Sequence, residues 1–280
     1  MAYQYRNWLT TGALPLRRGF GLLIFFILYK VVRYRYAEVI QNLSRSFPEK
    51  SYGEIKKIAA GFYRYFSCLF PEIISLLTVS RKDIPQRLRL HNAALLQHSQ
   101  AQGRNVIIMM GHYGNWEYMS MLPAFSATDM YAVYKPLSNR FTDRLMKKLR
   151  ARFGMKLLAM EEAPKHMLQA KRPATYIFIA DQSPAQGSRF TTDFLHQRTV
   201  VITGAERLAR ATDAVVLYAA VNREDDGGGW EISFSLITDD PDAMGQHAIT
   251  KKFTQYLEDD IRRCPACWLW THRRWKLKTQ

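Results

Sequence analysis

The sequence predicts an α/β fold with a mixed, mainly parallel central sheet flanked by helices and preceded by an N-terminal membrane-associated helix. Short apolar runs typical of buried strands alternate with helical patterns from about residue 100 onward, which favours parallel strands joined by helices. One further run, 230–237, alternates polar and apolar residues, as a half-exposed or edge strand does. The predicted strands are 106–110, 130–134, 175–180, 214–221 and 230–237.

Helical patterns occupy the stretches between these strands. We expect helices over 140–153, 163–171, 204–211 and 249–263, and a flexible turn at 225–229, where three glycines follow two aspartates. These glycines do not follow a strand–helix phosphate-loop pattern, so we read no nucleotide site there. At 280 residues the chain is long enough for one large domain or one domain with a small appendage.

The amino-terminal part carries an apolar segment over 19–29, with arginines before it and basic residues after it. As a helix this segment is about 16 Å long, short of the bilayer core, so it fits a marginal span or an interfacial helix. A small-residue cleavage site does not follow, and we expect the segment to be retained. A second apolar stretch over 61–77 strengthens the prediction of membrane attachment. A buried core helix is the alternative for either stretch. We divide the chain into a membrane-anchoring segment, 1–45, and a catalytic domain, 46–280.

Charge and cysteine content narrow the class of protein. Lysine and arginine total 40 against 24 acidic residues, a net charge of +16, which favours an anionic partner such as nucleic acid, anionic lipid or an acidic protein. Three cysteines argue against a disulfide framework and fit a reducing compartment. Cys264 and Cys267 have CxxC spacing but lack a second pair of ligands, so we expect two ordinary thiols and no metal site.

Polar side chains follow three of the predicted strands. His112 comes two residues after the first strand, Lys135 directly after the second and Asp181 directly after the third. Because ligands of open α/β sheets collect at the carboxyl ends of strands, these side chains should lie near one edge. Asp181 could orient an arginine or a substrate group, or act only as a strand-terminal cap.

His112 and Glu117 belong to the segment GHYGNWE. A turn at Gly114, with Asn115 as an N-cap, would put Glu117 in a first helical turn from which it reaches back to the imidazole. A carboxylate on one ring nitrogen leaves the other as a base. The nucleophile would then be the hydroxyl of an acceptor, which attacks an acyl thioester.

Several segments in order resemble the late acyltransferases of lipid A biosynthesis, the lauroyl/myristoyl type, within the lysophospholipid acyltransferase superfamily. HYGNWE resembles their H-x4-(D/E) motif, and the similarity spans about residues 30–276. The other similar segments are VYKPLSN at 133–139, RARFG at 150–154, IADQ at 179–182, TGAERLAR at 203–210, WLWTHRRWK at 268–276 and, near the amino end, VIQNLSRSFP at 39–48.

The resemblance implies a glycerol-3-phosphate acyltransferase-like fold and a transferase that needs no cofactor. It implies acyl carrier protein, or acyl-CoA, as donor, and a membrane glycolipid, such as a lipid A precursor, as acceptor. His112, Glu117 and Arg152 would be catalytic, with Arg152 preferred over Arg150 for stabilising the oxyanion. The remaining substrate-binding candidates are Asn115, Lys135, Asn139, Arg150, Asp181, Gln182, His272, Arg273 and Arg274. We expect the catalytic domain on the cytoplasmic face of the bacterial inner membrane, which is anionic.

Three alternatives remain open. The acceptor could be another membrane lipid, such as an aminolipid or a phosphatidylinositol mannoside. The charge and the 13% aromatic content also fit a basic nucleic-acid-binding protein, although the usual recognition motifs are missing and we expect no nucleic-acid partner. The third alternative is a membrane scaffold that keeps the fold without catalysis. The presence of both His112 and Glu117 argues against it.

Overall fold

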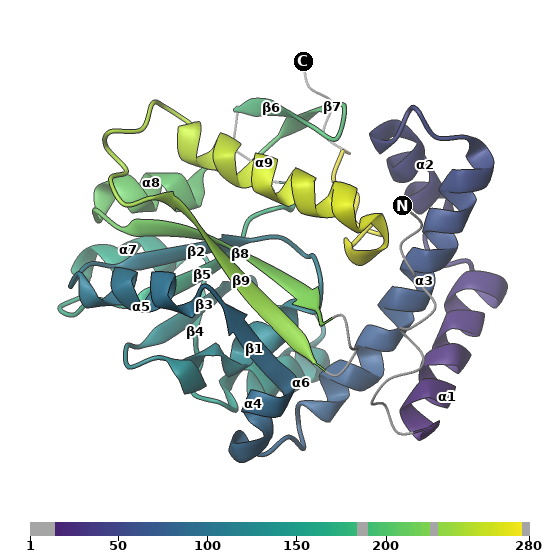
Figure 1. Cartoon of the computed structure of the whole chain (residues 1–280), viewed down its shortest axis with the longest axis horizontal. Helices are drawn as coiled ribbons and strands as arrows, with labels where there is room; N and C mark the ends of the chain where they lie inside the picture. Colours follow the sequence, from purple (N-terminus) through teal and green to yellow (C-terminus); the bar gives the residue numbers. More distant parts are fainter. Residues whose placement is uncertain (1–14, 184–189, 225–228, 276–280) are drawn as a thin grey trace.

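A computed structural model describes residues 15–183, 190–224 and 229–275. Its centre is a seven-stranded sheet in the order β1-β9-β8-β2-β5-β3-β4, and a separate two-stranded hairpin pairs β6 with β7 (Figure 1). The strands are β1 (Leu88–His91), β2 (Val106–Met110), β3 (Met130–Tyr134), β4 (Lys156–Ala159), β5 (Thr175–Ile179), β6 (Thr191–Phe194), β7 (Gln197–Val200), β8 (Val215–Arg223) and β9 (Trp230–Thr238).

The sheet is mainly parallel, as the sequence predicts. Every neighbouring pair in it is parallel except β8 and β9, which form an antiparallel pair. The predicted strand at 230–237 is therefore confirmed as β9, but it is not at an edge, because β1 covers it. The short strands β1 and β4 were not predicted; each has only four residues and lies at an edge of the sheet.

Helices cover both faces of the sheet. Residues of β2 alternate between two cores: Ile107 and Met109 pack in one, and Ile108 and Met110 in the other. Because both faces are buried, this strand is apolar throughout, as is typical of parallel sheets. The helices are α1 (Pro15–Phe25), α2 (Tyr36–Ser46), α3 (Tyr52–Ser75), α4 (Ile84–Arg87), α5 (Ala93–Ala101), α6 (Arg140–Ala151), α7 (Ala163–Gln169), α8 (Gly204–Ala211) and α9 (Ala248–Arg263), with a π-helix η2 (Phe26–Val31) and 3₁₀ helices η3 (Arg81–Asp83), η4 (Trp116–Phe125) and η5 (Pro265–Cys267).

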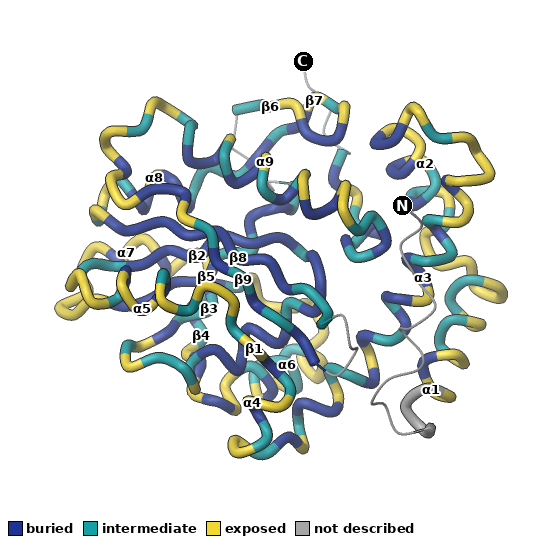
Figure 2. The backbone as a smooth tube through the Cα atoms, in the orientation of Figure 1, coloured by how far each residue is buried: buried dark blue, intermediate teal, exposed yellow. Residues whose placement is uncertain are grey.

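The amino-terminal helices lie together beside the sheet (Figure 1). Helix α3 begins at a capping box in which Ser51 and Glu54 satisfy each other's backbone N–H groups. Its buried side chains contribute to both cores, with Phe62 in one and Leu69 in the other, while α1 packs along its outer side. Figure 2 shows that exposed residues are frequent along α1. Within the described residues, none of the helices combines the length and apolar character needed to cross a membrane.

The structure corrects the expectation that Cys264 and Cys267 are two ordinary thiols. The structure joins them in a disulfide, with their Cα atoms 5.6 Å apart. The 3₁₀ helix η5 turns the chain between them and so brings the two sulfur atoms together. The turn predicted at 225–229 lies almost wholly outside the described residues.

Candidate active site

The strand ends bring His112 and Asp181 into contact. Met110 of β2 pairs in register with Ile179 of β5, so the residues that follow them leave the sheet side by side. His112 Nδ1 lies 2.6 Å from Asp181 Oδ1, and the His112 backbone N–H donates to Asp181 Oδ2 at 2.7 Å. Trp268 Nε1 donates to the same Oδ2 at 2.8 Å. Three donors therefore fix this carboxylate against the imidazole.

Asp181 is a carboxylate at neutral pH despite its burial. Burial alone would raise the pKa of Asp181, but the nearby His112, its two hydrogen bonds and that of Trp268 lower it from 3.8 to about 2. An ionised carboxylate can only accept a hydrogen bond, so the proton of the shared bond sits on His112 Nδ1. The other ring nitrogen, Nε2, is then unprotonated in the neutral imidazole, and it faces the Gln182 amide at 3.2 Å.

The structure corrects the expected pairing of His112 with Glu117, because Glu117 binds Arg150 instead. Glu117 is 4% exposed and binds Arg150 through both oxygens, at 2.8 Å from Nε and 2.6 Å from Nη2. Its Oε1 also accepts from Trp116 Nε1 at 3.0 Å. Glu117 does stand in the first turn of a helix, η4, but its carboxylate points to α6, and Trp116 stacks edge-on against His112 instead.

Arg150, rather than Arg152, belongs to the site. Residues two apart on a helix point about 200° from one another, so only one of the pair can face the cavity. Arg150 lines the cavity, whereas Arg152 is exposed and donates to the carbonyl of Val79 at 2.9 Å. Burial acts to lower the pKa of Arg150, but the hydrogen bonds and charge of Glu117 raise it overall, so the guanidinium stays charged.

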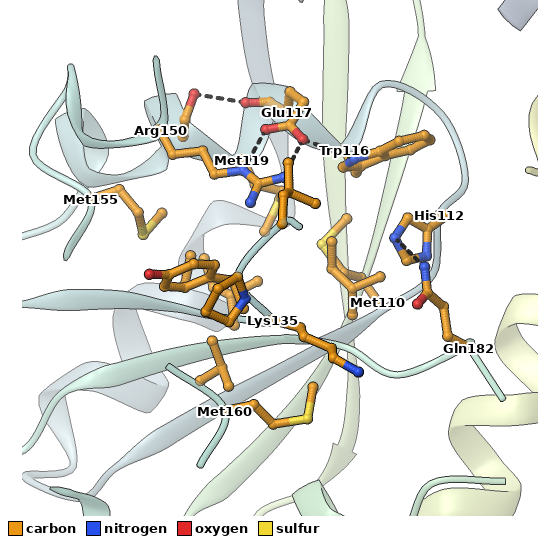
Figure 3. A pocket seen from close by; sticks show the side chains of 18 of the residues that line it. Met110, His112, Trp116, Glu117, Met119, Lys135, Arg150, Met155, Met160 and Gln182 are labelled. Carbon is orange, nitrogen blue, oxygen red and sulfur yellow. Dashed lines mark hydrogen bonds and ion pairs between the residues drawn. The ribbon is translucent and has the colours of Figure 1, made fainter. Parts of the chain in front are cut away.

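A cavity of about 440 Å³ opens beside His112 (Figure 3). His112 and Gln182 lie at one end of it, Met155 lies at the other, and Glu117 and Arg150 lie along one side. Most of its wall is apolar. The apolar lining includes Met110, Met119, Ala132, Val133, Met155, Met160, Ile177 and Ile179. A flexible, methionine-rich wall beside a few fixed polar groups suits a ligand with a long apolar part.

The loop that carries His112 is held from three directions, by residues that sequence reasoning missed. Gly114 makes the predicted turn with φ +67°, and a Cβ there would overlap the carbonyl oxygen of Val221. Its N–H donates to the carbonyl of Cys267 at 3.0 Å. Asn115 donates to Glu72 Oε2 at 3.1 Å, and Glu72 also pairs with Arg223 at 2.6 Å. Glu72 lies on α3, so no local pattern links it to the loop.

Two of the predicted substrate-binding residues have internal roles instead. Asn115 is fully buried and lies outside the cavity lining; its side chain does not cap η4, contrary to expectation. Asn139 caps α6 by accepting from the Thr142 N–H at 3.0 Å. In contrast, Lys135 and Gln182 line the cavity with His112, so all three predicted strand ends contribute to one site.

The closing basic segment binds the protein itself. Arg273 pairs with Glu38 at 2.6 Å, and Arg274 is buried and donates to the carbonyl of Val200 at 2.7 Å. Burial lowers the pKa of Arg274 to about 10 and that of His272 to about 4, so His272 is neutral near pH 7. None of the three lines the cavity beside His112.

Comparison with known proteins identifies the family to which the chain belongs. Residues 14–277 match the family model for bacterial lipid A biosynthesis acyltransferases. The chain is 23% identical over 243 residues to the lipid A biosynthesis palmitoleoyltransferase of Escherichia coli, covering 85% of this chain and 78% of that protein. It is 25% identical over 264 residues to a lipid A biosynthesis acyltransferase of Haemophilus influenzae, covering 93% and 83%.

Among solved structures, the 1-acyl-sn-glycerophosphate acyltransferase PlsC of Thermotoga maritima aligns with a TM-score of 0.41 at 13% identity, covering 90% of this chain and 99% of that one. The family model covers nearly the whole sequence, from before the first described helix to beyond the last described residue. The chain is an acyltransferase and belongs to the bacterial lipid A biosynthesis acyltransferase family.

Proposed function

We propose that this acyltransferase moves a fatty acyl chain from acyl carrier protein to a hydroxyl of a lipid A precursor, with His112 as the base and Asp181 as the residue that orients it. The observation that carries the proposal is the 2.6 Å contact between His112 Nδ1 and Asp181, which leaves Nε2 at the cavity. The names of the relatives support the acceptor, because they are enzymes of lipid A biosynthesis.

In the reaction, the imidazole of His112 carries one proton from the acceptor hydroxyl to the leaving thiolate. Nε2 takes the proton of the acceptor hydroxyl as its oxygen forms a bond to the thioester carbonyl carbon. The carbon–sulfur bond then breaks, and the imidazolium returns the proton to the leaving thiolate. Asp181 stabilises the imidazolium in between without being protonated itself. The entering hydroxyl displaces the amide of Gln182, which occupies Nε2 in the free enzyme.

Arg150 takes the role that we first expected of Arg152. Its Nε and Nη2 are bound to Glu117, whereas Nη1 has no hydrogen-bond partner among the described residues. A fixed guanidinium at the cavity wall can donate to the carbonyl oxygen as negative charge develops there. Glu117 therefore acts as a positioning residue that holds Arg150, and Lys135 adds a second cation at the cavity.

The amino-terminal helices provide a surface for lipid. Exposed apolar side chains gather on α1 and η2, and exposed Lys30, Arg33 and Arg35 lie at their carboxyl end. The exposed apolar side chains here are Phe20, Leu22, Leu23, Phe26, Ile27, Val31 and Val32. Apolar residues with a basic border suit an interfacial helix on an anionic leaflet. We propose attachment to the inner membrane with the cavity on its cytoplasmic side.

The test is transfer of a radiolabelled acyl chain from acyl carrier protein to a lipid A precursor, with the product identified by mass spectrometry. His112→Ala should abolish the transfer, and His98→Ala, which changes an exposed histidine of α5, should leave it unchanged. Circular dichroism checks that both variants fold. Transfer by folded His112→Ala at the wild-type rate would exclude His112 as the base. Product formed from another lipid alone would exclude the lipid A acceptor.

A further inference from the structure

Helix α6 carries a row of cations on its outer side. Arg140, Arg144 and Lys148 are four residues apart, so they lie along one face, and all three are exposed. The row is about 12 Å long at 1.5 Å per residue. Lys147 of the same helix pairs with Asp143 at 2.7 Å, but the three outer cations form no ion pair within the described residues.

This row begins at the mouth of the cavity. The loop 135–139 leads from β3 into α6, and the backbone N–H of Leu137 donates to Asp143 Oδ1 at 2.9 Å, which ties the loop to the helix. Lys135 and Leu137 line the cavity and are also exposed. Phe141, at the start of α6, is 76% exposed, and Leu137 is 44% exposed. A cationic row with two apolar side chains thus continues the rim of the cavity.

We propose that this surface, which consists of Lys135, Leu137, Arg140, Phe141, Arg144 and Lys148, is where an acidic acyl carrier protein docks. The inference rests on the proposed function, because that function requires a donor that delivers a thioester at the cavity mouth. Three exposed cations spread over about 12 Å can contact several carboxylates of an acidic protein at once. Opposite charge attracts the carrier, and its tethered acyl chain enters the adjoining cavity.

The membrane is the less suitable occupant of this surface. Lipid contact is already provided by α1 and η2, where apolar side chains far outnumber cations. On α6 the proportion is reversed, since three cations accompany the one exposed aromatic side chain of Phe141. The two surfaces therefore differ in chemistry, and the cationic one adjoins the cavity through Lys135 and Leu137.

The experiment compares two donors with the full-length protein: lauroyl-acyl carrier protein and lauroyl-pantetheine, which lacks both the protein and its charge. The test variant combines Arg140→Glu, Arg144→Glu and Lys148→Glu. The ratio of kcat/KM for the carrier donor to that for the pantetheine donor should fall about tenfold or more, because electrostatic steering raises association rates by about 10 to 1,000-fold. Added salt should lower the wild-type ratio and leave that of the variant nearly constant.

A matched control reverses three charges elsewhere. Lys165→Glu, Lys171→Glu and Arg172→Glu change exposed cations on α7 and just before β5, at the amino end of that strand, and should keep the wild-type ratio. An unchanged ratio in the α6 variant would overturn the docking surface. If that variant, with its ratio unchanged, also lost binding to phosphatidylglycerol vesicles, the result would show that α6 faces lipid instead. If the wild type uses neither donor, the proposed function fails instead.

Discussion

Replacing Asp181 by asparagine tests the pair that positions the base. Asparagine keeps the shape of the side chain but loses its charge, and its amide group can present a donor where His112 Nδ1 needs an acceptor. The imidazole would then lose both its orientation and the charge that stabilises its protonated form. General bases contribute about 10² to 10⁴ to rate, and a carboxylate-to-amide change in a comparable triad costs about 10⁴ in kcat. We therefore expect kcat for acyl transfer to fall by about 10² to 10⁴.

The same substitution has a cost in stability that can be calculated. The pKa of Asp181 is lowered from 3.8 to about 2 on folding, which corresponds to stabilisation on the order of 2 kcal/mol. Because the folded pKa is the lower one, this contribution is present above pH 4 and is lost as the pH falls toward 2. Urea unfolding near pH 7 should show Asp181→Asn destabilised by about that amount, with the difference from wild type shrinking below pH 4.

The assay measures kcat with saturating lauroyl-acyl carrier protein and a lipid A precursor. Asp260→Asn is the matched control, because Asp260 is equally buried at 4% exposure but binds Tyr218 and lies outside the cavity lining. This control should keep its kcat. A folded Asp181→Asn enzyme with a kcat close to that of wild type would refute the reasoning.

Three further changes test other parts of the structure. Gly114→Ala should destabilise the fold by about 3 kcal/mol or more, measured by urea unfolding, because φ is +67° and the added Cβ meets the carbonyl of Val221. Since burial lowers the pKa of His272 to about 4, the unfolded chain binds a proton first, so stability should fall as the pH drops from 6.5 toward 4, and His272→Gln should remove this dependence. Leu23→Glu should weaken flotation with phosphatidylglycerol vesicles about tenfold, whereas Leu168→Glu on α7 should not.

Strands and helices with strong local patterns were predictable from the sequence. The continuous apolar runs of β2 and β3 and the periodic helix α8 were predicted with the bounds that the structure shows. In β1 and β4 the runs are only four residues long, too short to separate from loop by periodicity. The π-helical turn η2, which follows directly on α1 and ends the first apolar helical segment, also has no clear signal in the sequence.

At the site, the sequence identified the strand ends but not their pairing. His112 and Asp181 are 69 residues apart, and only the register of β2 against β5 brings them together. Sequence proximity favoured Glu117, although its carboxylate is bound to Arg150 from α6. Helical phase does separate Arg150 from Arg152 onto different faces, but choosing the inward face requires the position of α6 on the sheet.

The contact between His112 and Asp181 can be observed directly by proton NMR of the enzyme with ¹⁵N-labelled histidine. A short hydrogen bond from His112 Nδ1–H to a carboxylate predicts a strongly downfield proton signal that disappears in His112→Ala and in Asp181→Asn but persists in Glu117→Gln. A signal that survives Asp181→Asn, or is lost in folded Glu117→Gln, would contradict Asp181 as the partner of the base.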